Sequence, residues 1–292
     1  MEHAAAHGDT GGKPRPTLYV VATPIGNLGD ITVRALDVLK SVDAIAAEDT
    51  RVTGRLLTHY GISKRLIAVH EHNEKRAAAQ VLALLAAGRS LALTCDAGTP
   101  AVSDPGALLV AAVRSAGFAV APVPGANAAI AAVSASGLAL PHFLFHGFLP
   151  ERPAARRREL AQLAALPYAM VFYEAPHRIE ECVADLRAAF GDARRIVLAR
   201  ELTKLFESVH ECALAEAEVW LAADPMRRKG EFVLIVEGAQ ARAASDAGAT
   251  RRTLEALLAE LPLRQAVALA ARITGGKKNE VYDLALQLKR DA

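Results

Sequence analysis

Five short apolar runs, separated by segments of helical periodicity, make up the first half of this sequence. The runs are TLYVVA, VDAIAA, LIAV, SLALTC and FAVAPV, and they lie between Thr17 and Gly137. They are apolar rather than alternating with polar residues, which is typical of strands that are covered on both faces of a sheet. Five consecutive strand–helix units of this kind predict an open, mainly parallel α/β sheet.

The segments between these runs carry signals for helix ends. Asp30 precedes the first helical segment, where an aspartate side chain can accept hydrogen bonds from free backbone amides. Gly88 and Gly117 follow the last turns of later helices, where a left-handed residue is favoured. Asp104 followed by Pro105 predicts the N-cap and the first position of another helix.

A second α/β pattern follows a break near Gly137. Its apolar runs are FLFHGF, YAMVFY, RRIVLAR, LFESVHE and EFVLIVEG. No helical segment separates the runs around Val197 and Val209, which predicts a hairpin and therefore a mixed sheet. Three more helical patterns follow a stretch of small residues. We therefore expect a flexible tail over 1–16, a parallel-sheet domain over 17–140, a mixed-sheet domain over 141–238, a linker over 239–250 and a small helical module over 251–292.

Composition limits the function classes that this chain can belong to. With 292 residues, 52% hydrophobic and 23% charged, it can form about two domains with cores of their own. The net charge is only +2, so any contact with nucleic acid must come from local basic clusters. Three cysteines without a CxxC pair argue against a disulfide framework or a zinc knuckle. No secretory signal and no long apolar run is present, so we expect a cytoplasmic protein without a membrane span.

The segment LTCDAGTPAVSDPG, residues 93–106, follows the fourth apolar run and restricts the ligand. The ligand crevice of a parallel sheet lies at the carboxyl ends of its strands, so this loop should border the crevice. The loop has no lysine or arginine, and the glycine-rich phosphate-binding patterns are absent from the chain. Ala97 and Gly98 would expose bare backbone to a ligand, and Asp96 can hold a cation. The pattern therefore favours a neutral or cationic ligand over a phosphate.

S-adenosylmethionine matches this description because it carries a sulfonium, an ammonium and an adenosine but no phosphate. The alternative is an ordinary strand-to-helix turn, which is rich in the same small residues. Further turns with Gly or Pro follow other strands at the same edge and favour a binding site. These turns are TPIGNLGD (23–30), AEDTR (47–51) and PVPGANAAI (122–130).

A set of motifs in a fixed order gives the sequence a resemblance along almost its whole length. The motifs are TPIGNLGDIT, AAEDTR, HEHNE, DAGTP, SDPG, FYEAPHR, ARELTK, RKGEFVLIVEG and KKNEVY. Together they resemble the bacterial 16S ribosomal RNA ribose-2′-O-methyltransferases that modify a cytidine of the decoding centre, within the tetrapyrrole-methylase superfamily. The resemblance implies two α/β domains with S-adenosylmethionine in the cleft between them, a homodimer, a C-terminal helix-turn-helix-like RNA-binding module, and 16S rRNA in the 30S subunit as partner.

The same resemblance assigns positions that contact the cofactor. They are Pro24, Gly26, Asp96, Ala97, Gly98, Thr99, Val102, Ala128, Ala129, Phe172, Tyr173, Lys229 and Gly230. The chain departs from the family pattern at two places. Cys95 stands where the family has serine before DAGTP, and Ala126 replaces the second proline of a PGP turn. Loss of that proline is expected to loosen the turn at 124–129.

Methyl transfer to a ribose hydroxyl requires alignment of the reacting atoms and removal of a proton. The candidates for these tasks are Glu174, His177, Arg178, Glu201 and Lys204. Glu174 is the first choice for a base or for positioning the hydroxyl, with Arg178 or Lys204 holding RNA phosphate. A structural cluster of salt bridges, or catalysis by alignment alone, is the alternative. No metal is expected, because His70-Glu71-His72 lacks a third ligand.

Basic clusters are the candidates for RNA contact. They comprise Arg156, Arg157, Arg227, Arg228, Lys277 and Lys278. Arginines on an exposed helix face are commonly just solvated, so the first two pairs are weak signals. Lys277 and Lys278 begin a helix, where positive charge opposes the helix dipole, and this unfavourable placement indicates phosphate binding. We expect the C-terminal module to bind RNA.

Two other functions remain open on the sequence. A methylase of a tetrapyrrole precursor would share the fold but give no reason for the extra helical module. A non-catalytic RNA-binding factor in ribosome assembly would retain only a vestigial cofactor pocket.

Overall fold

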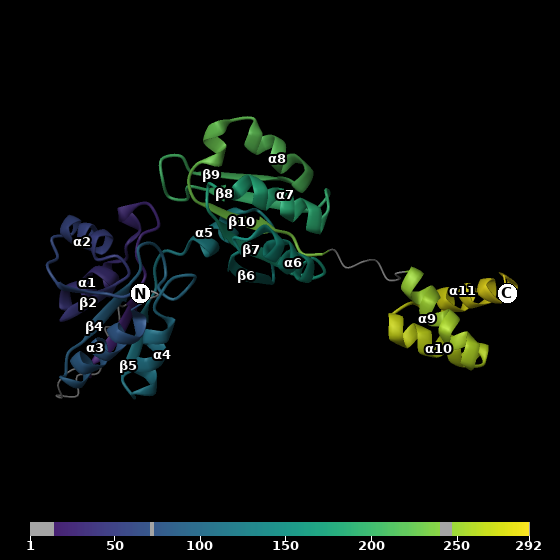
Figure 1. Cartoon of the computed structure of the whole chain (residues 1–292), viewed down its shortest axis with the longest axis horizontal. Coiled ribbons are helices and arrows are strands. Elements are labelled where there is room, and N and C mark those ends of the chain that lie inside the picture. Colours follow the sequence, from purple (N-terminus) through teal and green to yellow (C-terminus); the bar gives the residue numbers. More distant parts are fainter. Residues whose placement is uncertain (1–14, 71–72, 240–246, 292) are drawn as a thin grey trace, which may run out of the picture. The chain divides into compact units, whose positions relative to one another are not determined.

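The computed structural model describes residues 15–70, 73–239 and 247–291 of the chain (Figure 1). The chain divides into two compact units. One contains the described residues up to Ala161 together with Ala169–Glu237, and the other contains Gln162–Tyr168 and the described residues from Gly238 onward. Most of the expected tail and linker, 1–14 and 240–246, lies outside the described residues.

The first sheet is wholly parallel, with strand order β3-β2-β4-β1-β5. Its strands are β1 (Thr17–Val21), β2 (Ala44–Ala47), β3 (Arg65–Ala68), β4 (Leu91–Thr94) and β5 (Ala119–Val123). The helices that follow the strands are α1 (Val33–Ser41), α2 (Thr50–His59), α3 (Glu74–Ala86), α4 (Ala107–Ser115) and α5 (Ala128–Ala135). The predicted parallel α/β sheet is confirmed.

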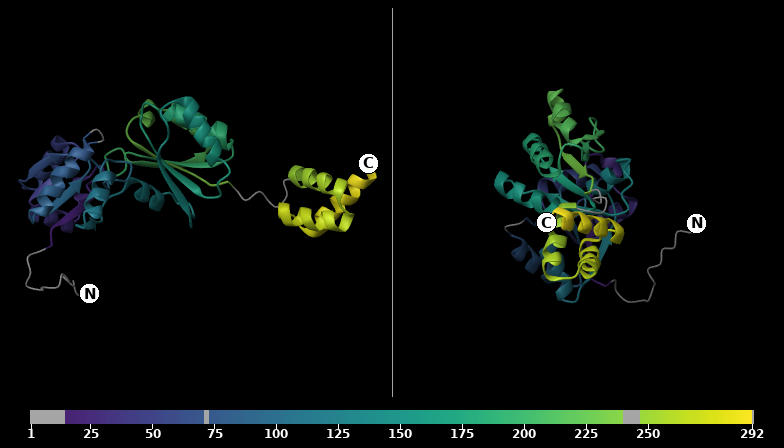
Figure 2. Two further views of the ribbon diagram at one scale, coloured as in Figure 1. Left: turned by 60° about the horizontal axis from the view of Figure 1, so that its bottom comes forward. Right: turned by 90° about the vertical axis from the view of Figure 1, so that its right-hand side faces the viewer.

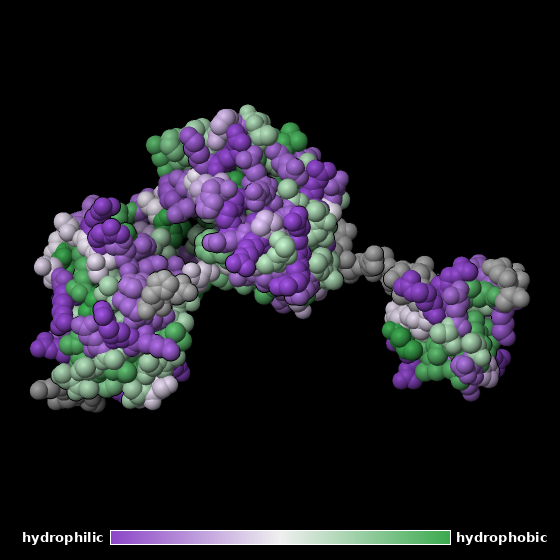
Figure 3. Space-filling model, in the orientation of Figure 1, coloured by the Kyte–Doolittle hydropathy of each residue, from purple (hydrophilic) through white to green (hydrophobic). Residues whose placement is uncertain are grey.

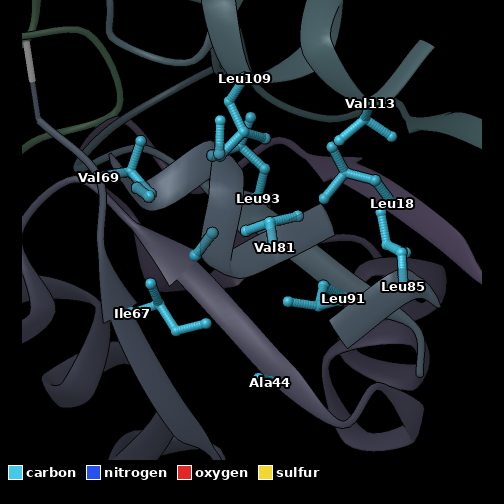
Figure 4. Packing of buried hydrophobic residues seen from close by; sticks show 13 residues of the cluster. Leu18, Ala44, Ile67, Val69, Val81, Leu85, Leu91, Leu93, Leu109 and Val113 are labelled. Atoms are coloured by element: carbon cyan, nitrogen blue, oxygen red, sulfur yellow. The ribbon is translucent and has the colours of Figure 1, made fainter. Parts of the chain in front are cut away.

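Neighbouring residues of each strand enter different cores, because successive side chains point to opposite faces of a sheet. Ile45 and Ala92 pack with α1 and α2, whereas Leu91 and Leu93 pack with α3 and α4. Figure 4 shows Leu91, Leu93 and Leu18 around Val81 of α3. Burying each leucine or valine contributes about 1.5–3 kcal/mol relative to exposure. Burial on both faces explains why the strands read as apolar runs.

The helix ends agree with the sequence at the glycines but not at Asp30. Gly88 and Gly117 have φ of +80° and +79°, as the sequence predicts. The Asp30 prediction is wrong, because Asp30 lies in a 3₁₀ turn and α1 is capped by Thr32, whose hydroxyl accepts from the Ala35 amide at 3.1 Å.

The start of α4 is also capped differently from the prediction. The helix begins at Ala107, so Asp104 is not its N-cap. The capping group is the buried Glu74, whose Oε1 accepts from the Gly106 amide at 3.1 Å and the Leu109 amide at 3.0 Å. A carboxylate at a helix N-terminus satisfies free amides and favours the helix dipole. Asp104 therefore takes no part in capping α4.

The second sheet is mixed, with strand order β6-β7-β10-β8-β9. Its strands are β6 (Phe143–Phe148), β7 (Ala169–Glu174), β8 (Arg195–Arg200), β9 (Ser208–Ala213) and β10 (Phe232–Val236), and its helices are α6 (Pro153–Leu163), α7 (Ile179–Phe190) and α8 (Leu214–Ala222). β6 and β7 are parallel, and β8 and β9 form the expected antiparallel pair. Figure 2 shows this sheet covered by helices, and α5 packs on it through Ala129 and Ala132.

The C-terminal part forms a three-helix module with a core of its own. Its helices are α9 (Ala247–Glu260), α10 (Leu263–Thr274) and α11 (Lys278–Asp291). Leu254, Val267 and Val281 are buried between them. Figure 3 shows hydrophobic residues gathered over the middle of its visible face, with hydrophilic residues along the top and outer edges of the module. No described helix is long and apolar enough to span a membrane.

Candidate active site

Three loops meet at the carboxyl edge of the first sheet. The loop after β1 pairs with the loop after β4, because the Thr23 amide donates to Gly98 O at 2.8 Å and the Gly98 amide donates to Thr23 O at 3.0 Å. Thr99 Oγ1 donates to Ala126 O at 3.2 Å and so joins the loop after β5. These bonds hold the DAGTP segment in a defined position.

The loops border a cavity of about 340 Å³. It is lined by Ile25, Ala97, Gly98, Thr99, Val102, Ser103, Asp104, Asn127, Ala128, Phe148, Tyr173, Glu174, Ala175, Pro176, Ala199, Leu202, Glu231, Phe232 and Val233. Loops that follow strands of the first sheet and strands of the second sheet both contribute to this lining, which contains three acidic residues and no lysine or arginine. The volume lies in the range of small-molecule sites, and the charge disfavours an anionic ligand.

The loops that border the cavity hold unusual backbone conformations. Among the described residues, positive φ outside glycine occurs at Ala101, Ser103, Glu201 and Thr203. Each such residue is strained by on the order of 1–3 kcal/mol, and strain of this kind clusters at ligand sites. Gly147, in the bulge of β6, allows Ser103 to approach, since a Cβ there would lie 2.6 Å from Ser103 Oγ.

Asp104 lies in the wall of this cavity, partly buried. Burial, with the negative charges of Glu48 and Asp96, raises the pKa of Asp104 to about 6, although the nearby Cys95 thiol lowers it. Burial also raises the pKa of the Cys95 thiol far above its usual value, so this cysteine is neutral. The Asp104 carboxyl group therefore titrates near neutral pH.

Glu174 is the last residue of β7 and lines the cavity. Its side chain is 0% exposed, with Oε1 accepting from the Ala175 amide at 2.8 Å and lying 3.1 Å from Arg178 Nε. The guanidinium of Arg178 also donates to the Leu149 carbonyl at 2.8 Å. Glu174 thus lines the cavity with a buried carboxylate that lies beside the guanidinium of Arg178. The roles of Glu174 as the base and of Arg178 as a phosphate ligand stay predictions.

The other predicted catalytic residues lie outside the cavity lining. His177 is exposed in the turn after β7. Glu201 accepts from Lys204 Nζ at 2.9 Å, and Lys204 also pairs with Glu231 at 2.8 Å. Burial opposes ionisation of Glu201, but the bonds from Lys204 and the Glu231 amide outweigh it and lower its pKa. These three residues form a salt-bridge cluster beside the cavity.

The predicted cofactor positions are distributed over more than one environment. Ala97, Gly98, Thr99, Val102, Ala128 and Tyr173 line the large cavity. Pro24 and Asp96 line a separate cavity of about 230 Å³. Gly26, Ala129, Phe172, Lys229 and Gly230 line neither cavity.

The positions outside both cavities have structural contacts of their own. Ala129 is buried, and its amide donates to the Tyr173 hydroxyl at 3.3 Å. Phe172 is fully buried. A Cβ on Gly26 would lie 2.5 Å from Lys204 Cγ, and a Cβ on Gly230 would overlap Glu201. These two glycines therefore allow loops to pack closely around the salt-bridge cluster, and cofactor contact at them stays a prediction.

Four polar residues of the cavity, Ser103, Asp104, Asn127 and Glu231, were not predicted from the sequence as site residues. Asp104 was assigned to a helix end, and Asn127 and Glu231 were not assigned at all. Asn127 caps α5 by accepting from the Ile130 amide at 3.1 Å. Asn127 could have been predicted, because asparagine after a strand and before a helix is a typical N-cap. Asp104 could not, because only the structure shows that the distant Glu74 takes the capping role at α4.

Arg156, predicted to contact RNA, is buried with 1% of its side chain exposed. Its Nε donates to Asp185 Oδ2 at 2.7 Å, and its Nη2 lies 3.3 Å from Glu181 Oε2. This correction follows from packing between α6 and α7, which encloses one arginine of the basic helix. Arg157 is 62% exposed and stays a candidate.

The remaining basic candidates are accessible to different degrees. Arg227 lies 4.8 Å from the centre of the Trp220 ring and donates to Trp220 O at 3.0 Å. Arg228 pairs with Glu180 at 3.0 Å. Lys277 is 79% exposed at the start of α11 and lies 3.6 Å from Glu280. Lys278 is exposed beside it.

No metal site is formed by three or more His, Cys, Asp or Glu residues within 15–70, 73–239 and 247–291. Of the HEH sequence, Glu71 and His72 lie outside the described residues.

Family models match both parts of the chain. Residues 17–218 match the family of tetrapyrrole (corrin/porphyrin) methylases, and residues 244–289 match the RsmI C-terminal HTH domain. The chain is 51% identical to ribosomal RNA small subunit methyltransferase I of Escherichia coli O157:H7, over 92% of this chain and 94% of that protein. It is also 51% identical to the Pseudomonas aeruginosa protein of the same name, over 93% and 97%.

Solved structures of other methyltransferases share the fold. The methyltransferase CobJ matches with a TM-score of 0.58 and 21% identity, covering 79% of this chain and 97% of that one. Cobalt precorrin-4 methyltransferase, a cobalamin biosynthetic enzyme, matches with a TM-score of 0.57 and 17% identity, covering 75% and 94%. At this identity the likeness shows the fold alone.

Proposed function

This chain belongs to the ribosomal RNA small subunit methyltransferase I family, which has the tetrapyrrole methylase fold, and from that premise we propose its reaction. It transfers a methyl group from S-adenosylmethionine to the ribose 2′-oxygen of a decoding-centre cytidine in 16S rRNA. The enzyme works in the cytoplasm as a homodimer on the 30S subunit.

The cavity is the observation that carries the proposal. Its wall combines small residues at Ala97 and Gly98 with acidic residues and has no lysine or arginine. S-adenosylmethionine has a cationic sulfonium and ammonium and no phosphate, so an acidic cavity wall without lysine or arginine fits this cofactor. When bound, it supplies an electrophilic methyl carbon.

The residues of the chain bind and align the reactants. Gly98, with φ of +87° and both backbone groups bonded to Thr23, presents a flat surface without a side chain. Phe148 and Tyr173 both line the cavity, and their ring centroids lie 5.6 Å apart. Alignment of a hydroxyl with the methyl carbon accounts for a large part of such rate accelerations.

The C-terminal module favours rRNA over a tetrapyrrole substrate. It matches a helix-turn-helix family model, and Lys277 and Lys278 are exposed at one helix start. A tetrapyrrole methylase has no need of such a module. We assign RNA phosphate contact to these two lysines, with Arg157, Arg227 and Arg228 as further candidates.

Mapping of ribose methylation in 16S rRNA, with and without the protein, tests this proposal. Purified 30S subunits, labelled methyl donor and protein should yield one new 2′-O-methyl group at a decoding-centre cytidine. If the protein methylates a tetrapyrrole precursor and not 30S subunits, the proposed substrate class is wrong. If calorimetry detects no binding of S-adenosylmethionine, the protein is instead a non-catalytic RNA-binding factor.

A further inference from the structure

Three large apolar side chains are exposed on the C-terminal helical module. Within residues 247–291 they are Leu269 and Ile273 of α10, with 37% and 65% exposed, and Tyr282 of α11, with 39% exposed. The buried core of the module consists of other residues, among them Leu254 and Val267. The three side chains are therefore available for a contact outside the module, and Tyr282 is the aromatic one.

Tyr282 lies between lysines on one stripe of α11. Lys278 comes four residues before Tyr282 and Lys289 seven residues after it, so all three share one side of the helix. Both lysines are exposed. At 3.6 residues per turn, the acidic residues Glu280 and Asp283 are turned away from Tyr282 by about 160° and about 100°. Positive charge thus flanks the aromatic ring on both sides along the helix.

The turn before α11 adds a third lysine at the same end of the stripe. Gly275 ends α10 with φ of +70°, and a Cβ on Gly276 would lie 3.1 Å from Val281 Cγ2, so the turn packs against the start of α11. Lys277 in this turn is 79% exposed, and its pair with Glu280 at 3.6 Å joins two exposed groups. Such pairs are weak, so the ammonium of Lys277 is available to another anion.

We propose that Tyr282 stacks on an unpaired base of the rRNA while the flanking lysines bind the adjacent phosphates; this inference rests on the proposed function. Positive side chains that follow the backbone, with aromatic rings between them for the bases, are the usual means of binding single strands. In a duplex the base faces are covered by neighbouring bases, so a ring can stack only where the strand is unpaired. A protein partner would cover the apolar side chains but would not explain three lysines around the tyrosine.

Salt dependence separates the contribution of the ring from that of the lysines. Binding through phosphates weakens as salt rises, whereas stacking persists. The full-length protein is titrated with a short, fluorescently labelled single-stranded RNA of mixed sequence. Tyr282→Ala should weaken binding by about 5–150-fold at every salt concentration, as for loss of one stacked base, without changing the log–log slope. Lys278→Ala should instead lower that slope by about 0.7.

Two matched variants and a second probe control for indirect effects. Tyr282→Phe keeps the ring face and should bind the single strand within about 3-fold of wild type. Leu269→Ala changes a residue of nearly equal exposure on α10 and should leave binding unchanged. The second probe is the same RNA annealed to its complement, for which Tyr282→Ala should change the affinity by less than about 2-fold because the base faces are covered.

Two results would overturn the stacking role. An equal loss on duplex and single strand would show that Tyr282 contacts the backbone or a groove. An equal loss for Leu269→Ala would show that the apolar surface of the module as a whole, and not the ring, determines affinity. The dissociation constant for S-adenosylmethionine should be the same in all variants, because none of the changed residues lines the cavity.

Methylation of 30S subunits by the wild type separates this inference from the proposed function. If the wild type methylates 30S subunits but does not bind the single strand, or if Tyr282→Ala binds it as tightly as the wild type, only the stacking role is wrong. If the wild type binds neither RNA and methylates nothing, the proposed function fails as well.

Discussion

Asp104 is partly buried among acidic groups, so its ionisation should weaken the folded state. Its pKa is about 6 in the folded protein against an ordinary value of 3.8. As pH rises between these values, the unfolded chain ionises first and stability is lost. We expect Asp104→Asn to raise the free energy of unfolding by on the order of 1–2 kcal/mol above about pH 7, and not at all below about pH 4. Urea unfolding at both pH values checks this, and an equal effect at each would contradict it.

Arg156 and Arg157 are neighbours in sequence with opposite environments. Arg156 is enclosed by Asp185 and Glu181, whereas Arg157 is exposed. Removing one partner of a buried ion pair costs about 3–5 kcal/mol, and removing an exposed one about 0–1 kcal/mol. Arg156→Ala should therefore destabilise the protein severely and Arg157→Ala hardly at all. Unfolding midpoints of the two variants provide the measurement, and similar midpoints would contradict the burial of Arg156.

At the scale of elements, strands and hairpin were predictable because their signals are local. Five apolar runs gave the parallel sheet, and the close runs around Val197 and Val209 gave the antiparallel pair. The shape of the site was harder to predict from the sequence. The close approach of the strained Ser103 depends on Gly147, which lies in β6 and is distant in sequence. Asp104 was assigned to a cap because Glu74, its replacement, is far away in sequence.

The capping of α4 by Glu74 predicts a specific pair of variants. Glu74→Ala removes the acceptor of the Gly106 and Leu109 amides and leaves both donors buried. This should cost about 1–3 kcal/mol of unfolding free energy, the usual penalty for unsatisfied buried groups. Glu74→Gln keeps an acceptor oxygen and should cost less than half as much. Amide hydrogen exchange at Leu109 should accelerate in the alanine variant only, and unchanged exchange would exclude the capping role.

At the scale of the whole molecule, the chain consists of units with separate cores. The C-terminal helices bury Leu254, Val267 and Val281 among themselves. The expected start at residue 251 falls inside α9, which begins at Ala247, because the first turn, AGAT, consists of small residues with little helical pattern. No residue of this module lines the cavity of about 340 Å³. Substrate binding and cofactor binding should therefore be separable.

Deletion of residues 246–292 tests this separation. Affinity for 30S subunits should fall by more than about 10-fold if the deleted lysines contact RNA phosphate as proposed. The dissociation constant for S-adenosylmethionine should stay within about 3-fold, because the deleted residues do not line the cavity. In the intact chain, Lys277→Ala with Lys278→Ala should reduce the salt dependence of 30S binding, with a slope lower by about 1–2 in log–log form. Calorimetry and binding titrations across salt concentrations distinguish the outcomes: equal losses for both ligands would show that the module supports the fold and not RNA binding.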